Sequence, residues 1–218
     1  MPSGPRTPNP GPLIIGHRGF PARHPDNSLA GVRAALAAGA DGVEVDVRPC
    51  ADGTWVCHHD RTRDGRAVRA WTAGALRRQG VPRLADVLAV VPAGRWIFVE
   101  VKLLGRAELS RRAGALVELL QRSPARVRLL SSSVTVLDVL GQELDAPRSW
   151  VIDELPPELP PSLELSPHHL LVEPLAACGR PLHPWTVNRP ERMRELATLG
   201  VASITSNRPD LARGVLHG

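Results

Sequence analysis

Acidic and basic side chains recur at two-residue spacing in two apolar runs of the sequence. Glu44 and Asp46 alternate with valines in the first run, and Glu100 and Lys102 do so in the second. Residues two apart on an extended strand point to the same face, so each pair shares a face. Two carboxylates about 5 Å apart repel by roughly 3 kcal/mol at an effective dielectric constant near 20. A positive group must therefore lie among these acids.

Two arrangements would supply that positive charge. In the first, Arg18 and Lys102 neutralise the acids in a structural ion network. In the second, Glu44, Asp46 and Glu100 bind a hard divalent cation. Three carboxylates with water in the remaining positions suit Mg²⁺ or Ca²⁺, and Mn²⁺ is also compatible. Zinc fits less well, because it favours histidine and cysteine ligands.

Two of the eight histidines are expected beside this cluster. His17 closes the first apolar run of the chain, and His59 ends an extended segment immediately before Asp60. A metal flanked by two imidazoles suits in-line displacement at phosphorus: one imidazole takes a proton from the nucleophile, and the other protonates the leaving oxygen. We favour His17 as the base and His59 as the acid, because Asp60 follows His59. Arg18 and Lys102 would then bind the non-bridging phosphate oxygens. We expect the other histidines to be loop or rim residues: His24, His58, His168, His169, His183 and His217.

Short apolar runs that predict strands alternate with helical patterns along the chain. The predicted strands are 13–15, 42–47, 96–102, 127–130, 150–152, 170–172, 182–187 and 202–205, with an extended return segment at 55–57. The predicted helices are 28–38, 84–91, 106–121, 134–140, 191–199 and 210–216. Eight strands, mostly followed by helices, indicate a compact (β/α)8 TIM barrel, in which polar residues at the carboxyl ends of strands carry the chemistry. The chain is near the lower size limit for this barrel, so some helices must be short. The proline-rich stretch 153–167 is expected to lack one.

The composition narrows the class of protein. The chain has 218 residues, of which 43% are hydrophobic and 22% charged, and no apolar run is long enough to cross a membrane. Residues 1–12 predict a disordered leader and residues 13–218 a single barrel domain. The three cysteines suggest neither a disulfide framework nor a zinc site, which favours the cytoplasm. A net charge of +5 favours phosphate-bearing partners, but aromatic residues make up only 3% and the arginines are scattered, which argues against nucleic acid.

Six segments of the sequence resemble the glycerophosphodiester phosphodiesterase family. They are HRGFPARHPDNSLAG (17–31), DGVEVDVRPCADGTWVCHHD (41–60), VPRLADVL (81–88), VEVK (99–102), PWTVN (184–188) and GVASITSNRPD (200–210). The resemblance runs in order over nearly the whole chain. It implies a (β/α)8 barrel that uses a divalent cation to hydrolyse glycerophosphodiesters, such as glycerophosphocholine or glycerophosphoethanolamine, to glycerol 3-phosphate and an alcohol.

The resemblance also implies roles for individual residues. It implies metal ligands at Glu44, Asp46 and Glu100, an acid–base pair at His17 and His59, phosphate contacts at Arg18 and Lys102, and Trp185 packed against the glycerol. The family's usual Pro-Glu-Asn-Thr is Pro-Asp-Asn-Ser at 25–28, and its Thr-Asp is Ser-Asn at 206–207. We expect Asn27 and Asn207 to act as helix N-caps in preference to substrate contacts. The segment 61–80 is a short, arginine-rich link where the family often inserts a small lid. This predicts an open mouth and less than a hundredfold discrimination among alcohol headgroups.

Three other functions compete with this one. A lysophospholipase D acting on lysophospholipids would draw on the basic charge to approach anionic surfaces. A non-catalytic phosphate-binding barrel is disfavoured, because all three acids and both histidines are present. A nucleic-acid binder would lose affinity steeply with salt. The sequence leaves open whether water or the substrate's glycerol hydroxyl attacks phosphorus, which headgroup and metal are preferred, and the oligomeric state.

Overall fold

The computed structural model describes residues 11–102 and 104–218. The strands are β1 (Leu13–Gly16), β2 (Gly42–Pro49), β3 (Trp55–Cys57), β4 (Thr62–Arg63), β5 (Arg66–Ala67), β6 (Trp96–Val101), β7 (Arg126–Ser131), β8 (Arg148–Ile152), β9 (Glu164–Pro167) and β10 (Ser203–Ser206). The α-helices are α1 (Leu29–Ala37), α2 (Ala73–Arg78), α3 (Leu84–Leu88), α4 (Arg106–Gln121), α5 (Val134–Gly141), α6 (Val172–Leu175), α7 (Pro190–Thr198) and α8 (Pro209–His217). Three 3₁₀ turns are η1 (Val68–Ala70), η2 (His169–Leu171) and η3 (Ala176–Cys178). The leader predicted for residues 1–12 lies almost entirely outside the described residues.

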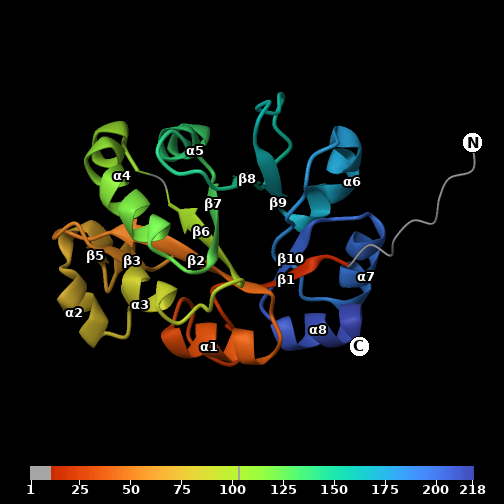
Figure 1. Cartoon of the computed structure of the whole chain (residues 1–218), viewed down its shortest axis with the longest axis horizontal. Helices are drawn as coiled ribbons and strands as arrows, with labels where there is room; N and C mark the ends of the chain where they lie inside the picture. The colour runs from red at the N-terminus through yellow and green to blue at the C-terminus, as the bar shows by residue number, and fades with distance from the viewer. Residues whose placement is uncertain (1–10, 103) are drawn as a thin grey trace, which may run out of the picture.

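The strands form a curled parallel sheet with helices around its outside (Figure 1). Its order is β10-β1-β2-β6-β7-β8-β9, and β3 pairs antiparallel with β2. The segment 182–187 lies between the two ends of this order. Leu182 bridges Leu165 of β9 in parallel, and Trp185 bridges His168 directly after β9. On the other side, Val187 N donates to Thr205 O of β10 at 2.9 Å. This segment takes the place of the remaining barrel strand, as the predicted (β/α)8 fold requires.

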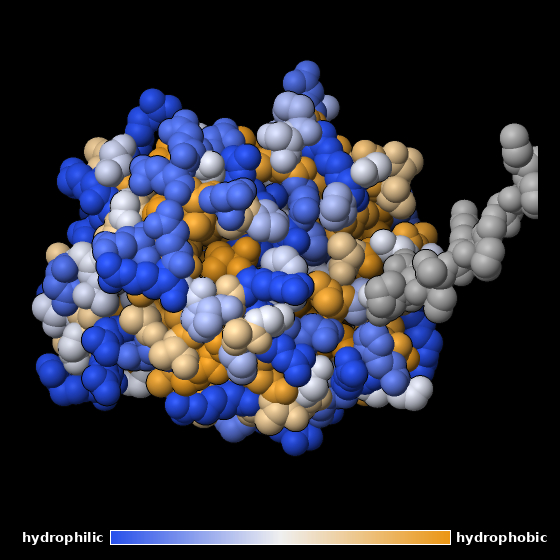
Figure 2. Space-filling view, in the orientation of Figure 1, coloured by the Kyte–Doolittle hydropathy of each residue, from blue (hydrophilic) through white to orange (hydrophobic). Residues whose placement is uncertain are grey.

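Hydrophobic periodicity determines how the strands and helices pack. The valines of β2 at 43, 45 and 47 are fully buried on the helix side of the sheet, because they alternate with the acids. Helix α4 buries the predicted stripe of Leu109, Ala113, Leu116, Val117 and Leu120. Its outer surface carries charged residues, and Figure 2 shows hydrophilic residues over much of the visible face. The core therefore lies between the barrel wall and its helices.

One predicted strand was wrong. The run 170–172 belongs to η2 and α6, and the strand at this position is β9. Leu170 is 65% exposed, so this apolar residue does not belong to a buried strand. The side chains of Glu164 and Ser166 contact other polar groups in the barrel interior, which hides the apolar alternation expected of a strand. Residues 153–163 contain no helix, as their prolines predicted.

The segment after β3 is more than a link. It folds into the β4–β5 hairpin, turn η1 and helix α2. Thr72 caps α2, its Oγ1 accepting from Ala75 N at 3.3 Å. Val68 and Leu76 bury their side chains with Cys50 in a small core separate from the main one. The insertion is therefore a compact wall beside the barrel.

No helix within the described residues combines the length and the apolar character that crossing a bilayer requires.

Candidate active site

The loop after β1 presents two of the predicted site residues. A Cβ on Gly16 would collide with the carbonyl oxygen of Gly19, and one on Gly19 would lie 2.7 Å from the backbone of Gly31. Glycine at both positions therefore permits the tight turn that carries His17 and Arg18. Arg18 has a positive φ of 50°, an uncommon conformation for a non-glycine residue.

The register of β2 and β6 brings the three predicted acids together. Asp46 pairs directly with Glu100 across the two parallel strands, and Glu44 lies two residues earlier on β2. Ligand atoms of all three carboxylates lie within 4.8 Å of one another. Arg18 and Lys102 flank the cluster: Arg18 Nε lies 3.1 Å from Asp46 Oδ2, and Lys102 Nζ lies 2.8 Å from Asp46 Oδ1 and 2.6 Å from Glu100 Oε1.

The surroundings shift the pKa values of the three carboxyl groups in different directions. Burial raises the pKa of Glu44 well above its ordinary value, and the nearby charges of Asp46 and Glu100 raise it further. Burial also raises the pKa of Glu100, although Lys102 opposes this. At Asp46, Lys102 and Arg18 outweigh burial and hold the pKa below its ordinary value. Asp46 is therefore the securely ionised member.

The cluster contains fewer positive groups than carboxyl groups. Three carboxylates face the two cations Arg18 and Lys102, and Arg18 also pairs with Asp26 at 2.9 Å, which is shorter than its 3.1 Å contact with Asp46. Glu44 is 3% exposed, and its Oε1 has no hydrogen-bond partner among the described residues. A buried oxygen left in this state is costly. An all-oxygen donor set with one orphaned carboxylate oxygen fits a hard divalent cation.

Both predicted histidines border the same cavity, and each has an oxygen partner on Nδ1. The cavity is small, about 80 Å³. His17 Nδ1 lies 2.7 Å from Asn207 Oδ1, while its Nε2 faces Glu44 Oε2 at 3.9 Å. His59 Nδ1 lies 2.8 Å from Asp60 Oδ1. Burial lowers the pKa of His17, although the hydrogen bond to Asn207 opposes the shift.

The cavity brings together nearly all the predicted residues. Its lining is His17, Arg18, Glu44, His59, Glu100, Lys102, Leu130, Val151, Ser166, Trp185 and Thr205. Asp46 lies beneath this surface, where it is 1% exposed. The indole of Trp185 is held by its Nε1, which donates to Ser166 O at 2.8 Å.

The two predicted N-caps were wrong. Ser28 caps α1, whereas the side chain of Asn27 clamps Asp46: its Nδ2 donates to Asp46 Oδ2 at 2.9 Å and its Oδ1 accepts from Asp46 N at 3.0 Å. Asn207 precedes α8 without capping it and reaches His17 instead. Both asparagines hydrogen-bond to site residues that are distant in sequence, and local sequence patterns do not reveal such contacts.

One histidine expected on the rim lies inside the barrel. His183 is 1% exposed, with Nδ1 2.8 Å from Ser203 Oγ and Nε2 2.9 Å from Glu164 Oε2. Arg128 also pairs with Glu164. This polar network is part of the barrel interior, and it meets the site cavity at Ser166, whose Oγ donates to His183 O at 3.0 Å.

Comparison with known proteins finds one family, one relative and two solved structures that this chain resembles. The model of the glycerophosphoryl diester phosphodiesterase family matches residues 17–160 and 112–211. The "Probable glycerophosphodiester phosphodiesterase 2" of Mycobacterium tuberculosis is 31% identical, over 94% of this chain and 91% of its own. Two solved structures share the fold. An Oleispira antarctica phosphodiesterase in complex with the product sn-glycerol-3-phosphate has TM-score 0.81 and 21% identity, over 94% of this chain and 96% of that one. A glycerophosphodiester phosphodiesterase from Thermotoga maritima has TM-score 0.76 and 22% identity, over 92% and 96%.

Proposed function

The chain belongs to the glycerophosphoryl diester phosphodiesterase family, a family of phosphoric diester hydrolases, and we propose how its residues cleave glycerophosphodiesters to glycerol 3-phosphate and an alcohol. One observation carries the proposal. Three carboxylates, two imidazoles and two cations meet around a single cavity. This donor set matches the needs of phosphoryl displacement, which are charge neutralisation and proton transfer on both sides of phosphorus.

Glu44, Asp46 and Glu100 are the residues that would hold a divalent cation. The orphaned Oε1 of Glu44 and the charge shortfall of the cluster support this assignment. Such a cation supplies Lewis acidity at a phosphate oxygen. Mg²⁺ and Ca²⁺ suit the all-oxygen donors, and Mn²⁺ is an alternative.

His17 is the proposed general base. Asn207 Oδ1 only accepts hydrogen bonds, so His17 Nδ1 carries the ring proton and Nε2 keeps a free lone pair. Burial keeps this ring neutral by lowering its pKa. His17 takes the proton of the attacking oxygen, which belongs either to water or to the substrate's own glycerol hydroxyl.

His59 is the proposed general acid. Asp60 accepts from its Nδ1 and orients the ring, so that Nε2 can protonate the departing alcohol as its bond to phosphorus breaks. The guanidinium of Arg18 and the ammonium of Lys102 would bind the non-bridging oxygens. Trp185, also at the cavity wall, would pack against the glycerol.

The test is release of sn-glycerol 3-phosphate from glycerophosphocholine, with lysophosphatidylcholine assayed in parallel. His17→Ala and His59→Ala should each lower kcat by about 10²-fold or more, the range for lost acid–base catalysis. His58→Ala is the matched control, because His58 is adjacent in sequence but does not line the cavity. Turnover by either alanine variant at the rate of this control would refute the assigned roles. Faster cleavage of the lysophospholipid would favour the lysophospholipase D alternative.

A further inference from the structure

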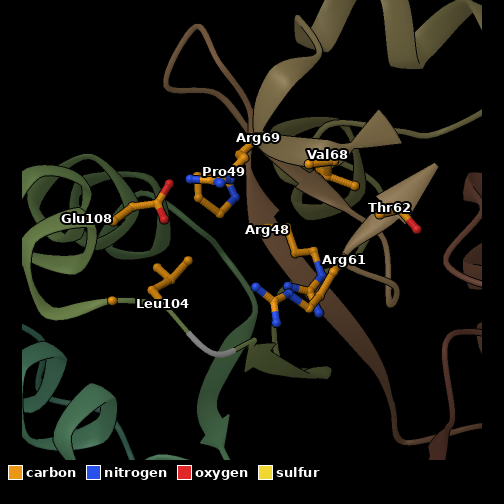
Figure 3. Close-up of a pocket in the computed structure, with 10 residues that line it drawn as sticks. Arg48, Pro49, Arg61, Thr62, Val68, Arg69, Leu104 and Glu108 are labelled. Carbon is orange, nitrogen blue, oxygen red and sulfur yellow. The ribbon is translucent and has the colours of Figure 1, made fainter. Parts of the chain in front are cut away.

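A second and larger pocket lies between the insertion and the start of α4. It encloses about 560 Å³, within the range of small-molecule sites. Its lining is Arg48, Pro49, Arg61, Thr62, Ala67, Val68, Arg69, Leu104, Gly105 and Glu108. Figure 3 shows the guanidinium groups of Arg48 and Arg61 next to each other and the carboxylate of Glu108 on the opposite side.

The lining of this pocket is cationic. Arg48, Arg61 and Arg69 contribute three guanidinium groups, and none of them forms an ion pair with a carboxylate in the described part of the chain. The one acidic residue of this lining is Glu108, whose Oε1 lies 3.7 Å from Arg112 Nε. Arg48 is partly buried. Clustered guanidinium groups without an ion-paired carboxylate are the arrangement that an anionic ligand would stabilise.

The pocket adjoins the active site on the side of the proposed acid. Arg48 follows Asp46 by two residues on β2, so it continues the same face about 6.6 Å farther along the strand. Its Nε donates to the carbonyl oxygen of His59 at 2.9 Å. Arg61 follows His59 by two residues. His59 is proposed to protonate the leaving alcohol, so the arginines lie where that alcohol departs.

The size of the active-site cavity also indicates that the leaving alcohol extends toward the arginines. At about 80 Å³ it has room for a phosphate group and little more, so the rest of a glycerophosphodiester must extend beyond it. The arginine-lined pocket is seven times larger and begins two residues along β2. A three-carbon bridge between two phosphates is comparable in length to that two-residue step.

We propose that the pocket lined by Arg48, Arg61 and Arg69 binds a second phosphate group on the leaving alcohol, so that diesters with a phosphate-bearing headgroup are preferred substrates. The proposal rests on the hydrolytic function proposed above. For glycerophosphoglycerol phosphate, water adds its oxygen to the diester phosphorus, the bond to the second glycerol breaks, and that oxygen leaves with a proton. The products are glycerol 3-phosphate and a second glycerol phosphate, whose phosphate monoester passes through unchanged.

The experiment compares two substrates that differ only in the terminal phosphate, glycerophosphoglycerol and glycerophosphoglycerol phosphate. The wild-type chain should show about tenfold higher kcat/KM for the phosphate-bearing substrate at low salt, and added salt should reduce this ratio. The double variant Arg61→Gln/Arg69→Gln should remove the preference while changing kcat/KM for glycerophosphoglycerol less than twofold. Arg78→Gln is the matched control, because Arg78 is exposed on α2 in the same insertion and outside the pocket.

Binding of the same two compounds, measured by calorimetry in the presence of a chelator, separates this inference from the proposed function. If neither compound is hydrolysed, the hydrolytic function fails, while tenfold tighter binding of the phosphate-bearing compound by wild type than by the double variant still supports the pocket. Equal kcat/KM and equal binding for the two compounds in wild type would overturn the inference. An equal loss toward both substrates in the double variant would also overturn it, since that would indicate a structural role. Competition by inorganic phosphate that is the same in wild type and the double variant would show that the arginines do not form a phosphate site.

Discussion

Replacing Asn207 by alanine tests whether this side chain orients the proposed base. The substitution removes the oxygen that lies 2.7 Å from His17 Nδ1 and leaves a largely buried ring nitrogen without a partner. Such a loss costs about 1–3 kcal/mol. If that cost falls on the transition state, kcat should decrease by about 5-fold to 150-fold.

The same substitution separates this role from the helix N-cap expected from sequence. An N-cap would cost about 1 kcal/mol of folding stability and leave kcat unchanged. We expect the reverse, a lower kcat with a thermal unfolding midpoint close to that of wild type. Initial rates of glycerol 3-phosphate release, together with a melting curve, measure both quantities.

Asn207→Asp provides the companion variant. It keeps an acceptor at His17 Nδ1 and adds a negative charge, which favours the imidazolium and should raise the pKa of His17. A base must be neutral to act, so the acidic limb of kcat/KM should move to higher pH. In wild type that limb should lie below 6.5, because burial lowers this pKa. An alanine variant with wild-type kcat, or an aspartate variant with an unshifted profile, would refute the reasoning.

Three further outcomes follow from the structure. Burial, followed by the charge of Arg128, holds the pKa of His183 well below 6.5. As the pH falls, the unfolded chain therefore takes up this proton before the folded chain does. The free energy of unfolding should be fully retained above pH 6.5 and should decline as the pH falls below it. Denaturant titrations should show this decline weakened in His183→Asn, and an identical pH dependence would contradict it. Millimolar Mg²⁺ or Ca²⁺ should raise the melting temperature of wild type but not of Glu44→Gln, as mass action on a folded-state site requires; equal shifts in both proteins would place the ion elsewhere. Trp185→Ala should raise KM for glycerophosphocholine about tenfold, since roughly 1–2 kcal/mol of apolar contact is lost, and an unchanged KM would remove the indole from the glycerol site.

The sequence predicts which side of the strands the three acids face, because their positions depend on local alternation. The valines of β2 and β6 occupy the helix side of both strands, so alternation alone places Glu44, Asp46 and Glu100 on the opposite face. The stripe of α4 follows from the same logic at a helical period. Segments with strong amphipathic repeats were therefore predicted correctly.

The parts that depend on contacts distant in sequence could not be predicted in this way. Asn207 meets His17 only because β10 pairs with β1 and closes the barrel, joining positions 190 residues apart. His183 is buried because Glu164 and Ser203 supply partners from neighbouring strands. Strand β9 could not be predicted from sequence for the same reason, because its inward-facing residues are hydrophilic. The segment 61–80 was expected to be only a link because its small core depends on residues outside it, Cys50 before it and Val81 after it.

Turnover of glycerophosphocholine before and after metal removal tests the central claim, that the three clustered carboxylates form a divalent-cation site that supports hydrolysis. Chelation should abolish release of glycerol 3-phosphate, and Mg²⁺, Mn²⁺ or Ca²⁺ should restore it to wild type but not to Glu44→Gln. Undiminished turnover by the fully chelated chain, or full restoration in Glu44→Gln, would contradict the account.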